Sequence, residues 1–241
     1  MTIEIKELTK CYREKVVVDQ LSFSIKQGEF FALLGQNAAG KTSTIKMLCG
    51  LLLPTDGDAL LDGKSIVENQ VAAKKIMNIS PQETAVAPNL TVFENLLFLG
   101  RIYGCSKTQA RERANANMEL FALSQRQNDK AKTLSGGFKR RLSIAMAMMS
   151  NPKILFLDEP TLGLDVRARH DLWKILSGLK GKVTIVLTTH YLEEVEMLAD
   201  RVGIMHHGRL CALGTIQQLM HETKQSSLEK IFLAYTEEGL C

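Results

Sequence analysis

One glycine-flanked loop constrains this chain more than any other feature. It follows a nearly continuous apolar run from Glu29 to Leu34, and a helical pattern from Lys41 to Gly50 comes after it. The pattern G-x-x-x-x-G-K-[ST] between a buried strand and a helix is typical of a phosphate-binding loop. A short strand that is apolar throughout is expected to be buried on both faces, which favours an α/β fold with a parallel sheet.

Each part of this loop suits the phosphates of a nucleoside triphosphate. Glycines let the backbone turn so that successive N–H groups face phosphate oxygens, and the N-terminus of the following helix adds positive partial charge. Lys41 supplies a charge for the β- and γ-phosphates, and Thr42 offers a hydroxyl to Mg²⁺. The residues expected to contact the nucleotide here are Gly35, Gln36, Asn37, Ala38, Ala39, Gly40, Lys41, Thr42 and Ser43.

A second apolar strand, 154–157, ends in two adjacent carboxylates, Asp158 and Glu159. Ligands gather at the carboxyl ends of the strands of a parallel sheet, so both side chains are expected near the phosphate loop. Asp158 fits a role as an Mg²⁺ ligand, through water. Glu159 is then placed to orient or deprotonate the attacking water, which predicts hydrolysis.

The segment Leu134-Ser135-Gly136-Gly137, placed before a helix and between the phosphate loop and Asp158, resembles the signature of ABC ATPases. Physically it is a second anion cradle, made of a hydroxyl, glycine amides and a helix N-terminus. The resemblance implies that ATP and Mg²⁺ are the cofactors. It also implies that Ser135, Gly136 and Gly137 bind, in trans, the ATP held by a partner subunit.

The resemblance covers nearly the whole chain and implies further roles. Tyr12 matches the aromatic residue that stacks on adenine, and Gln82 matches the glutamine that contacts Mg²⁺ and couples to a transmembrane partner. His190 matches the histidine at the γ-phosphate, and Leu164-Asp165 matches a loop at the dimer interface. The expected catalytic residues are then Lys41, Gln82, Glu159 and His190, and the expected metal ligands are Thr42, Gln82 and Asp158.

The expected architecture is α/β: a P-loop NTPase core with a mostly parallel sheet, an N-terminal antiparallel β subdomain and an inserted α-helical subdomain. Within one ABC ATPase domain, 1–241, the core and β subdomain take 1–81 and 151–214. The helical subdomain takes 82–150, and a short helical tail takes 215–241. Thr91 with Glu94, and Ser106 with Gln109, are predicted capping boxes that open two helices of the insertion, which run to about residues 103 and 123.

Composition sets limits on partners and location. The net charge is only +4 over 241 residues and the densest cluster is Lys139-Arg140-Arg141, interpreted as a solvated helix face, so we expect no nucleic-acid partner. No signal-peptide pattern begins the chain and no apolar run could span a bilayer. A cytoplasmic subunit, peripheral on the inner face of the cell membrane and bound to a separate permease, is expected.

The cysteines and two departures from the family pattern lead to further predictions. The five cysteines are scattered and form no CxxC pair, so neither a zinc site nor a disulfide framework is predicted, and a reducing compartment is favoured. Ala38 stands where the family usually has glycine, and costs on the order of 1 kcal/mol if that position needs φ > 0. Phe138 replaces the usual glutamine after the signature, which predicts weaker dimer closure.

These observations predict an ATP-binding and hydrolysing subunit of an ABC transporter, with closest resemblance to the single-cassette drug-export branch. It would energise export through a transmembrane partner by head-to-tail dimerisation, as a homodimer or as a heterodimer with a second cassette. Two alternatives stay open. One is a regulatory cassette with little turnover, and the other is a soluble ABC protein that acts on DNA or ribosomes.

Overall fold

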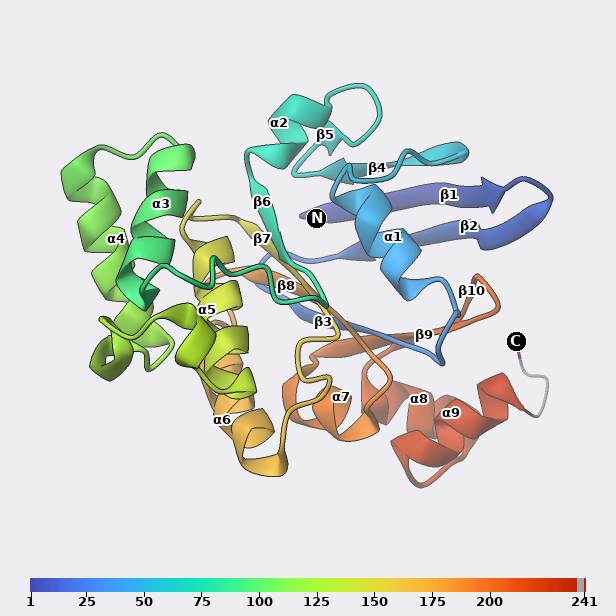
Figure 1. Cartoon of the computed structure of the whole chain (residues 1–241). Coiled ribbons are helices and arrows are strands. Elements are labelled where there is room, and N and C mark those ends of the chain that lie inside the picture. Colours follow the sequence, from blue (N-terminus) through green and yellow to red (C-terminus); the bar gives the residue numbers. More distant parts are fainter. Residues whose placement is uncertain (238–240) are drawn as a thin grey trace.

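In the computed structural model, which describes residues 1–237 and 241, a six-stranded sheet forms the centre of the molecule (Figure 1). Its order is β10-β9-β3-β8-β7-β6, and every pairing is parallel except that of β9 with β10. This confirms the mostly parallel core. The strands are β3 (Phe30–Leu34), β6 (Met77–Ser80), β7 (Ile154–Asp158), β8 (Thr184–Thr189), β9 (Arg201–His206) and β10 (Arg209–Gly214).

A four-stranded sheet of order β2-β1-β4-β5 forms the N-terminal β subdomain. All of its pairings are antiparallel, as predicted. Its strands are β1 (Ile3–Tyr12), β2 (Lys15–Ile25), β4 (Asp56–Leu61) and β5 (Lys64–Ser65). The two-residue β5 and the short helix α2 (Gln70–Lys74) were not predicted, because elements this short show no apolar periodicity.

Three helices, α3, α4 and α5, lie together at one side of the molecule (Figure 1). Both predicted capping boxes are present, at Thr91 with Glu94 and at Ser106 with Gln109. The second helix ends at Leu120, slightly before the predicted end. The remaining bounds are α1 (Lys41–Leu48), α3 (Val92–Ile102), α4 (Lys107–Leu120), α5 (Gly136–Met148), α6 (Val166–Ser177), α7 (Leu192–Leu198), α8 (Ile216–Thr223) and α9 (Leu228–Thr236).

Two hydrophobic clusters divide the faces of the main sheet. Along β3, Phe30, Ala32 and Leu34 belong to the cluster that includes the helical insertion, α6, α7 and the C-terminal helices. Phe31 and Leu33 belong to the cluster that includes α1 and the antiparallel sheet. Because successive side chains of a strand point to opposite faces, burial on both faces accounts for the continuous apolar run before the phosphate loop.

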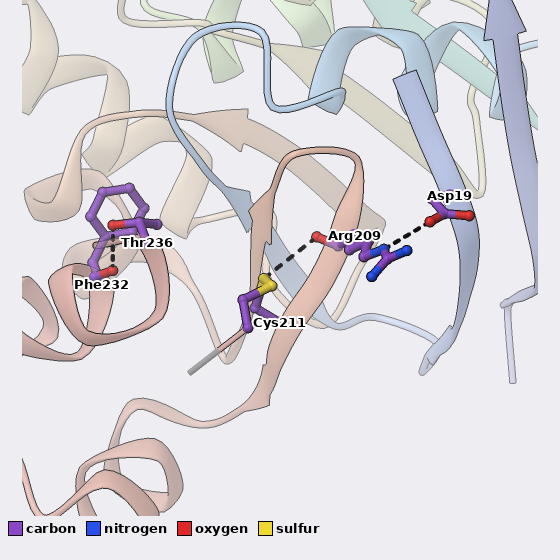
Figure 2. Close-up of a disulfide and its surroundings, with 6 residues drawn as sticks. Asp19, Arg209, Cys211, Phe232 and Thr236 are labelled. Carbon is purple, nitrogen blue, oxygen red and sulfur yellow. Dashed lines mark hydrogen bonds and ion pairs between the residues drawn. A yellow bond between two sulfur atoms is a disulfide. The ribbon is translucent and has the colours of Figure 1, made fainter. Parts of the chain in front are cut away.

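A disulfide joins Cys211 in β10 to Cys241, which corrects the expectation that no disulfide forms (Figure 2). The two residues are 30 positions apart, and the bond depends on the chain returning to β10 after α9. Cysteine spacing carries no information about such a return. Beside this disulfide, the side chain of Arg209 donates to Asp19 at 2.7 Å and ties the β9–β10 hairpin to β2 (Figure 2).

The predicted tail 215–241 contains α8 and α9, while 238–240 lie outside the described residues. Among the described residues, no helix is both long enough and apolar enough to cross a membrane.

One buried carboxyl group sits between α6 and α7. Glu194 is 0% exposed, and its Oε1 accepts a hydrogen bond from Trp173 Nε1 at 3.2 Å. Burial raises the pKa of Glu194, because the charged form loses its hydration. The folded state therefore holds a proton on Glu194 over a pH range in which the unfolded chain has lost it.

Substitution of Leu33 by alanine tests the position of the core. Leu33 is 1% exposed in β3, so Leu33→Ala is expected to lower the free energy of unfolding by about 2–5 kcal/mol. Leu51 is 64% exposed, and the same change there is expected to cost far less. Urea unfolding of both variants measures the difference; equal losses would contradict the packing described.

Substitution of Glu194 by glutamine tests the buried proton. The folded-state pKa is raised above the unfolded value, so stability is fully present below the unfolded pKa and is lost as pH rises toward the folded pKa. Glutamine cannot ionise, so Glu194→Gln is expected to lose less unfolding free energy than wild type between about pH 5 and about pH 8. Urea titrations at the two pH values provide the test, and an identical loss in both proteins would show that Glu194 is ionised in the fold.

Candidate functional site

A cavity of about 820 Å³ lies at the carboxyl ends of the parallel strands. Residues 36–43, between β3 and the second turn of α1, line one part of it. Gln82 follows β6, Glu159 follows β7 and His190 follows β8, and all three also line the cavity. The parallel sheet therefore brings together residues from four separate segments, and Glu159 lies beside the phosphate loop as predicted from the carboxyl ends of the strands.

The phosphate loop has the backbone geometry that its glycines indicated. Gly40 has φ 104° and begins α1, and a Cβ at Gly35 would collide with the carbonyl oxygen of Met205. Among the described hydrogen bonds, the amides of Asn37, Ala38 and Gly40 have no acceptor. Free N–H groups at a helix N-terminus form a site that fits phosphate oxygens.

Ala38 adopts φ 65°, in the left-handed region. The cost predicted for Ala38 depended on a positive φ at this position, and the structure shows that the position has one. An alanine there costs on the order of 1 kcal/mol relative to glycine, because its Cβ crowds the following carbonyl. The loop keeps its conformation despite this strain.

Lys41 is held inside the loop by oxygen atoms. Its Nζ donates to the carbonyls of Gly35 at 2.7 Å and Gln36 at 3.0 Å, and lies 3.4 Å from Glu159 Oε1. The side chain is 5% exposed. Burial lowers the pKa of Lys41, and the neighbouring Glu159 carboxylate opposes that shift. The ammonium group lies where it can meet an anion that enters the loop.

Two of the expected metal ligands touch each other. Thr42 Oγ1 donates to Asp158 Oδ1 at 3.1 Å, which joins the start of α1 to the end of β7. The hydroxyl of Thr188 in β8 donates to the same carboxylate oxygen. A carboxylate beside a threonine hydroxyl at a phosphate loop is an oxygen donor set that suits Mg²⁺. Gln82, the third expected ligand, lines the same cavity and is exposed.

Glu159 links the phosphate loop to His190. Its Oε2 lies 2.6 Å from His190 Nδ1, while its Oε1 faces Lys41. The Glu159 backbone is also left-handed, with φ 48°, and its N–H donates to the carbonyl of Thr188 at 3.1 Å. Such a conformation costs on the order of 1–3 kcal/mol and occurs where the surroundings fix a functional side chain.

Other expected residues lie outside the cavity lining. Tyr12, at the end of β1, is 48% exposed and is not among the lining residues, whereas Lys15 and Val16 of β2 are. The contact of Tyr12 with adenine therefore stays a prediction. Ser135 and the two glycines after it also lie outside this cavity, which fits residues expected to act on a partner's nucleotide.

Two helix N-termini lack the side-chain cap that the other long helices of the described residues have. Among the described helices of eight or more residues, only α1 and α5 begin without a side-chain cap. These are the helices that follow the phosphate loop and Ser135. Ser135 is the N-cap residue of α5, yet its hydroxyl accepts no capping bond, and it is exposed. Both helix ends thus leave their N–H groups available to a ligand.

Phe138, the second departure, lies in the first turn of α5 between two arginines. The guanidinium of Arg126 is 5.4 Å and that of Arg141 is 5.1 Å from the ring centroid. Arg141 also pairs with Asp171 of α6 at 2.9 Å. The aromatic ring thus takes part in a cation–π arrangement beside the signature turn, in place of a polar side chain.

The interpretation of the basic cluster as a solvated helix face was wrong at two of its three residues, because Arg140 is buried and the Arg141 side chain is only 11% exposed in its pair with Asp171. Arg140 is 3% exposed and donates to carbonyls beside the cavity. Thr188 was also missed as a partner of Asp158 and of the Glu159 amide. A polar residue near the end of an apolar strand, two positions before His190, was the available signal for Thr188. No local pattern distinguishes Arg140 from its charged neighbours.

Glycine at position 38 tests the strain in the loop. Ala38→Gly relieves the left-handed alanine, so the free energy of unfolding is expected to hold steady or rise by up to about 1 kcal/mol. The adjacent Ala39→Gly is the matched control, because Ala39 is 4% exposed and has no positive φ, and it is expected to lose stability. Urea unfolding compares them; a loss in Ala38→Gly as large as that in Ala39→Gly would contradict the strain.

The chain is similar to known proteins in both sequence and fold. The family model described as "ABC transporter" matches residues 18–162. The linearmycin resistance ATP-binding protein LnrL of Bacillus subtilis (strain 168) is 41% identical over 214 residues, which cover 88% of this chain and 69% of the relative. The Nod factor export ATP-binding protein I of Paraburkholderia xenovorans (strain LB400) is 42% identical, covering 90% and 72%.

Solved structures agree in fold along the chain. An ATP-binding subunit of an ABC transporter superposes with TM-score 0.86 at 29% identity, covering 98% of this chain and 99% of the other. The dimeric cassette MJ0796, bound to ADP and Pi after hydrolysis, gives TM-score 0.78 at 25% identity, covering 88% and 98%. Together with the cavity and its residues, these matches show that the chain belongs to the ABC transporter family of ATP-binding ATPase subunits.

Proposed function

We propose that this chain hydrolyses ATP to drive export through a separate transmembrane protein, and that it does so as a head-to-tail pair. In that pair, each nucleotide lies between the phosphate loop of one subunit and the Ser135 turn of the other. The pair is two copies of this chain or one copy with a second cassette. The relatives named for linearmycin resistance and Nod factor export support the export role.

One observation carries the pairing: α5 presents an uncapped N-terminus outside its own chain's cavity, and among the described residues the Ser135 hydroxyl makes no capping bond. An anion cradle that faces no ligand of its own is complete only when another molecule brings a phosphate to it. A two-fold pair satisfies both cradles at once, because each surface meets the other reciprocally. The dimeric MJ0796 cassette gives this arrangement a structural parallel.

The cavity residues divide the chemistry among them. Lys41 and the amides of Asn37, Ala38 and Gly40 would hold the phosphates. Thr42, Asp158 and Gln82 would hold Mg²⁺. Bound Mg²⁺ neutralises charge that develops on the β- and γ-phosphate oxygens. Glu159 would accept the proton of the attacking water, and His190, 2.6 Å from it, would orient Glu159 and contact the γ-phosphate.

We propose a docking surface for the transmembrane partner on α3 and its C-cap residue Tyr103, after the exposed loop that carries Gln82. Phe98, Ile102 and Tyr103 are 55%, 61% and 41% exposed. Phe98 and Ile102 are one turn apart and share a helix face. Asn78 Nδ2 in β6 donates to Tyr103 Oη at 2.9 Å, which connects this surface to the strand before Gln82. We propose that a cytoplasmic segment of the permease binds it and that the subunit works on the inner face of the membrane.

Substitution of Glu159 by glutamine tests the reaction and the pair together. Glutamine keeps the shape of the side chain but cannot accept the proton, so phosphate release with Mg²⁺ is expected to fall by about 10²–10⁴-fold. ATP should then convert the protein to a stable dimer in size-exclusion chromatography.

The control is Glu196→Gln, because Glu196 is an exposed glutamate of α7 outside the cavity lining. It is expected to keep wild-type turnover. Unchanged turnover in Glu159→Gln would remove Glu159 from its assigned role. A wild-type protein that binds ATP and releases no phosphate would favour the regulatory alternative instead.

A further inference from the structure

Arg140, in the second turn of α5, makes an unusual set of contacts for a charged residue. It is 3% exposed, and its Nη1 donates to the carbonyl of Pro81 at 2.6 Å. Its Nη2 donates to the carbonyl of Gln82 at 2.6 Å and lies 3.4 Å from the carbonyl oxygen of Glu159. One guanidinium thus joins α5 to the segments that follow β6 and β7.

All of these partners are backbone oxygens. Among the ion pairs of the described residues, none includes Arg140. The planar guanidinium presents its donors in a rigid fork, so two acceptors bound by it are fixed relative to each other. Charge-assisted hydrogen bonds are also about twice as strong as neutral ones. The fork therefore holds the Gln82 loop and the Glu159 backbone at a set distance from α5.

Two more polar contacts keep α5 in register with β6. Ser143 Oγ lies 3.0 Å from Ser80 Oγ, and Asn78 Nδ2 donates to the carbonyl of Ala147 at 2.8 Å. Positions 140, 143 and 147 share one face of the helix. Positions 78, 80 and 82 are every second residue along β6 and the segment that extends it, which is the spacing of residues on one face of a strand. Of these contacts, that of Arg140 is the one that reaches residues of the cavity.

We propose that Arg140 is a positioning residue for hydrolysis, which sets Gln82 and Glu159 from the helix that presents Ser135. This inference rests on the proposed function, because it assumes that Gln82 and Glu159 serve ATP hydrolysis. Arg140 touches neither group's side chain in the contacts described, and it acts through their backbones. Its effect is on where the hydrolytic groups stand.

This role predicts a split between binding and turnover. The cavity lining that meets the phosphates, 36–43, includes no atom of Arg140, so nucleotide affinity should not depend on it. Turnover should depend on Arg140, because a misplacement of about 1 Å in a catalytic group can cost on the order of 10²-fold in rate. A residue needed only for folding would change the amount of active protein and leave kcat per folded molecule unchanged.

The experiment compares Arg140→Gln and Arg140→Lys with wild type, as full-length chains. Phosphate release with Mg²⁺ gives kcat, and isothermal titration of ATP without Mg²⁺ gives Kd. For Arg140→Gln we expect kcat to fall by about 10–100-fold, with Kd within about twofold of wild type. Lysine keeps the charge but lacks the fork, so Arg140→Lys should have an intermediate kcat.

Arg113→Gln is the matched control. Arg113 of α4 also donates to a carbonyl, that of Met149 at 3.1 Å, and it lies away from the cavity lining. Its kcat should stay within about twofold of wild type. An equal loss of kcat in Arg113→Gln and Arg140→Gln would overturn the proposal, because a general loosening of the helical segment would then explain both.

Other results would also overturn the positioning role of Arg140. A folded Arg140→Gln with wild-type kcat, or with Kd weakened in proportion to kcat, would overturn the positioning role. If Arg140→Gln does not fold by circular dichroism, Arg140→Lys decides, and wild-type kcat in that variant overturns the role. These results leave the proposed function standing, whereas a wild-type chain without ATP hydrolysis would overturn both.

Discussion

The rest of the site depends on how one buried cation, Lys41, is held. A buried charge without partners would cost several kcal/mol, so its ammonium needs oxygen atoms on every side. Two loop carbonyls and Glu159 supply them, at 2.7, 3.0 and 3.4 Å. Those oxygens belong to the ends of β3 and β7, which the parallel order of the main sheet brings to one edge with β8 between them. The Lys41 ammonium therefore joins the phosphate loop to the Glu159 carboxylate through contacts within the protein itself.

The stability of the molecule and its activity draw on different residues. The helices of eight or more residues away from the two anion cradles begin with side-chain caps, and two hydrophobic clusters fill the faces of the main sheet. At the site the opposite holds. Ala38 and Glu159 are left-handed, and α1 and α5 begin uncapped. Among the described helices of eight or more residues, the uncapped N-termini are those at which a ligand is expected to meet the N–H groups.

Polar contacts of α5 join the helical insertion to the core. A rigid insertion that moves freely against the sheet would need few polar links to it. Instead, Arg140, Ser143 and the Ala147 carbonyl bind successive positions of β6 and of the loop after it. The helix that would face a partner's nucleotide is thus joined directly to the backbone of Gln82 and Glu159.

Much of the fold was predictable because it follows from local rules. The apolar run of β3, the glycines of the loop, the capping boxes at Thr91 and Ser106, and the carboxylates after β7 each act within a few residues. From the sequence we could also predict that Lys41, Asp158 and Glu159 would share one site, because parallel strands end at one edge. Tyr12 shows the limit, since its family role does not show whether it lines the cavity.

What the sequence by itself determined is therefore the order of the longer strands and helices and the chemistry of the phosphate loop. Only the tertiary structure decided the burial of Arg140, the bond between Cys211 and Cys241, and the contact of Glu159 with His190, because each depends on groups far apart in the chain that meet only when the sheet and its helices have packed.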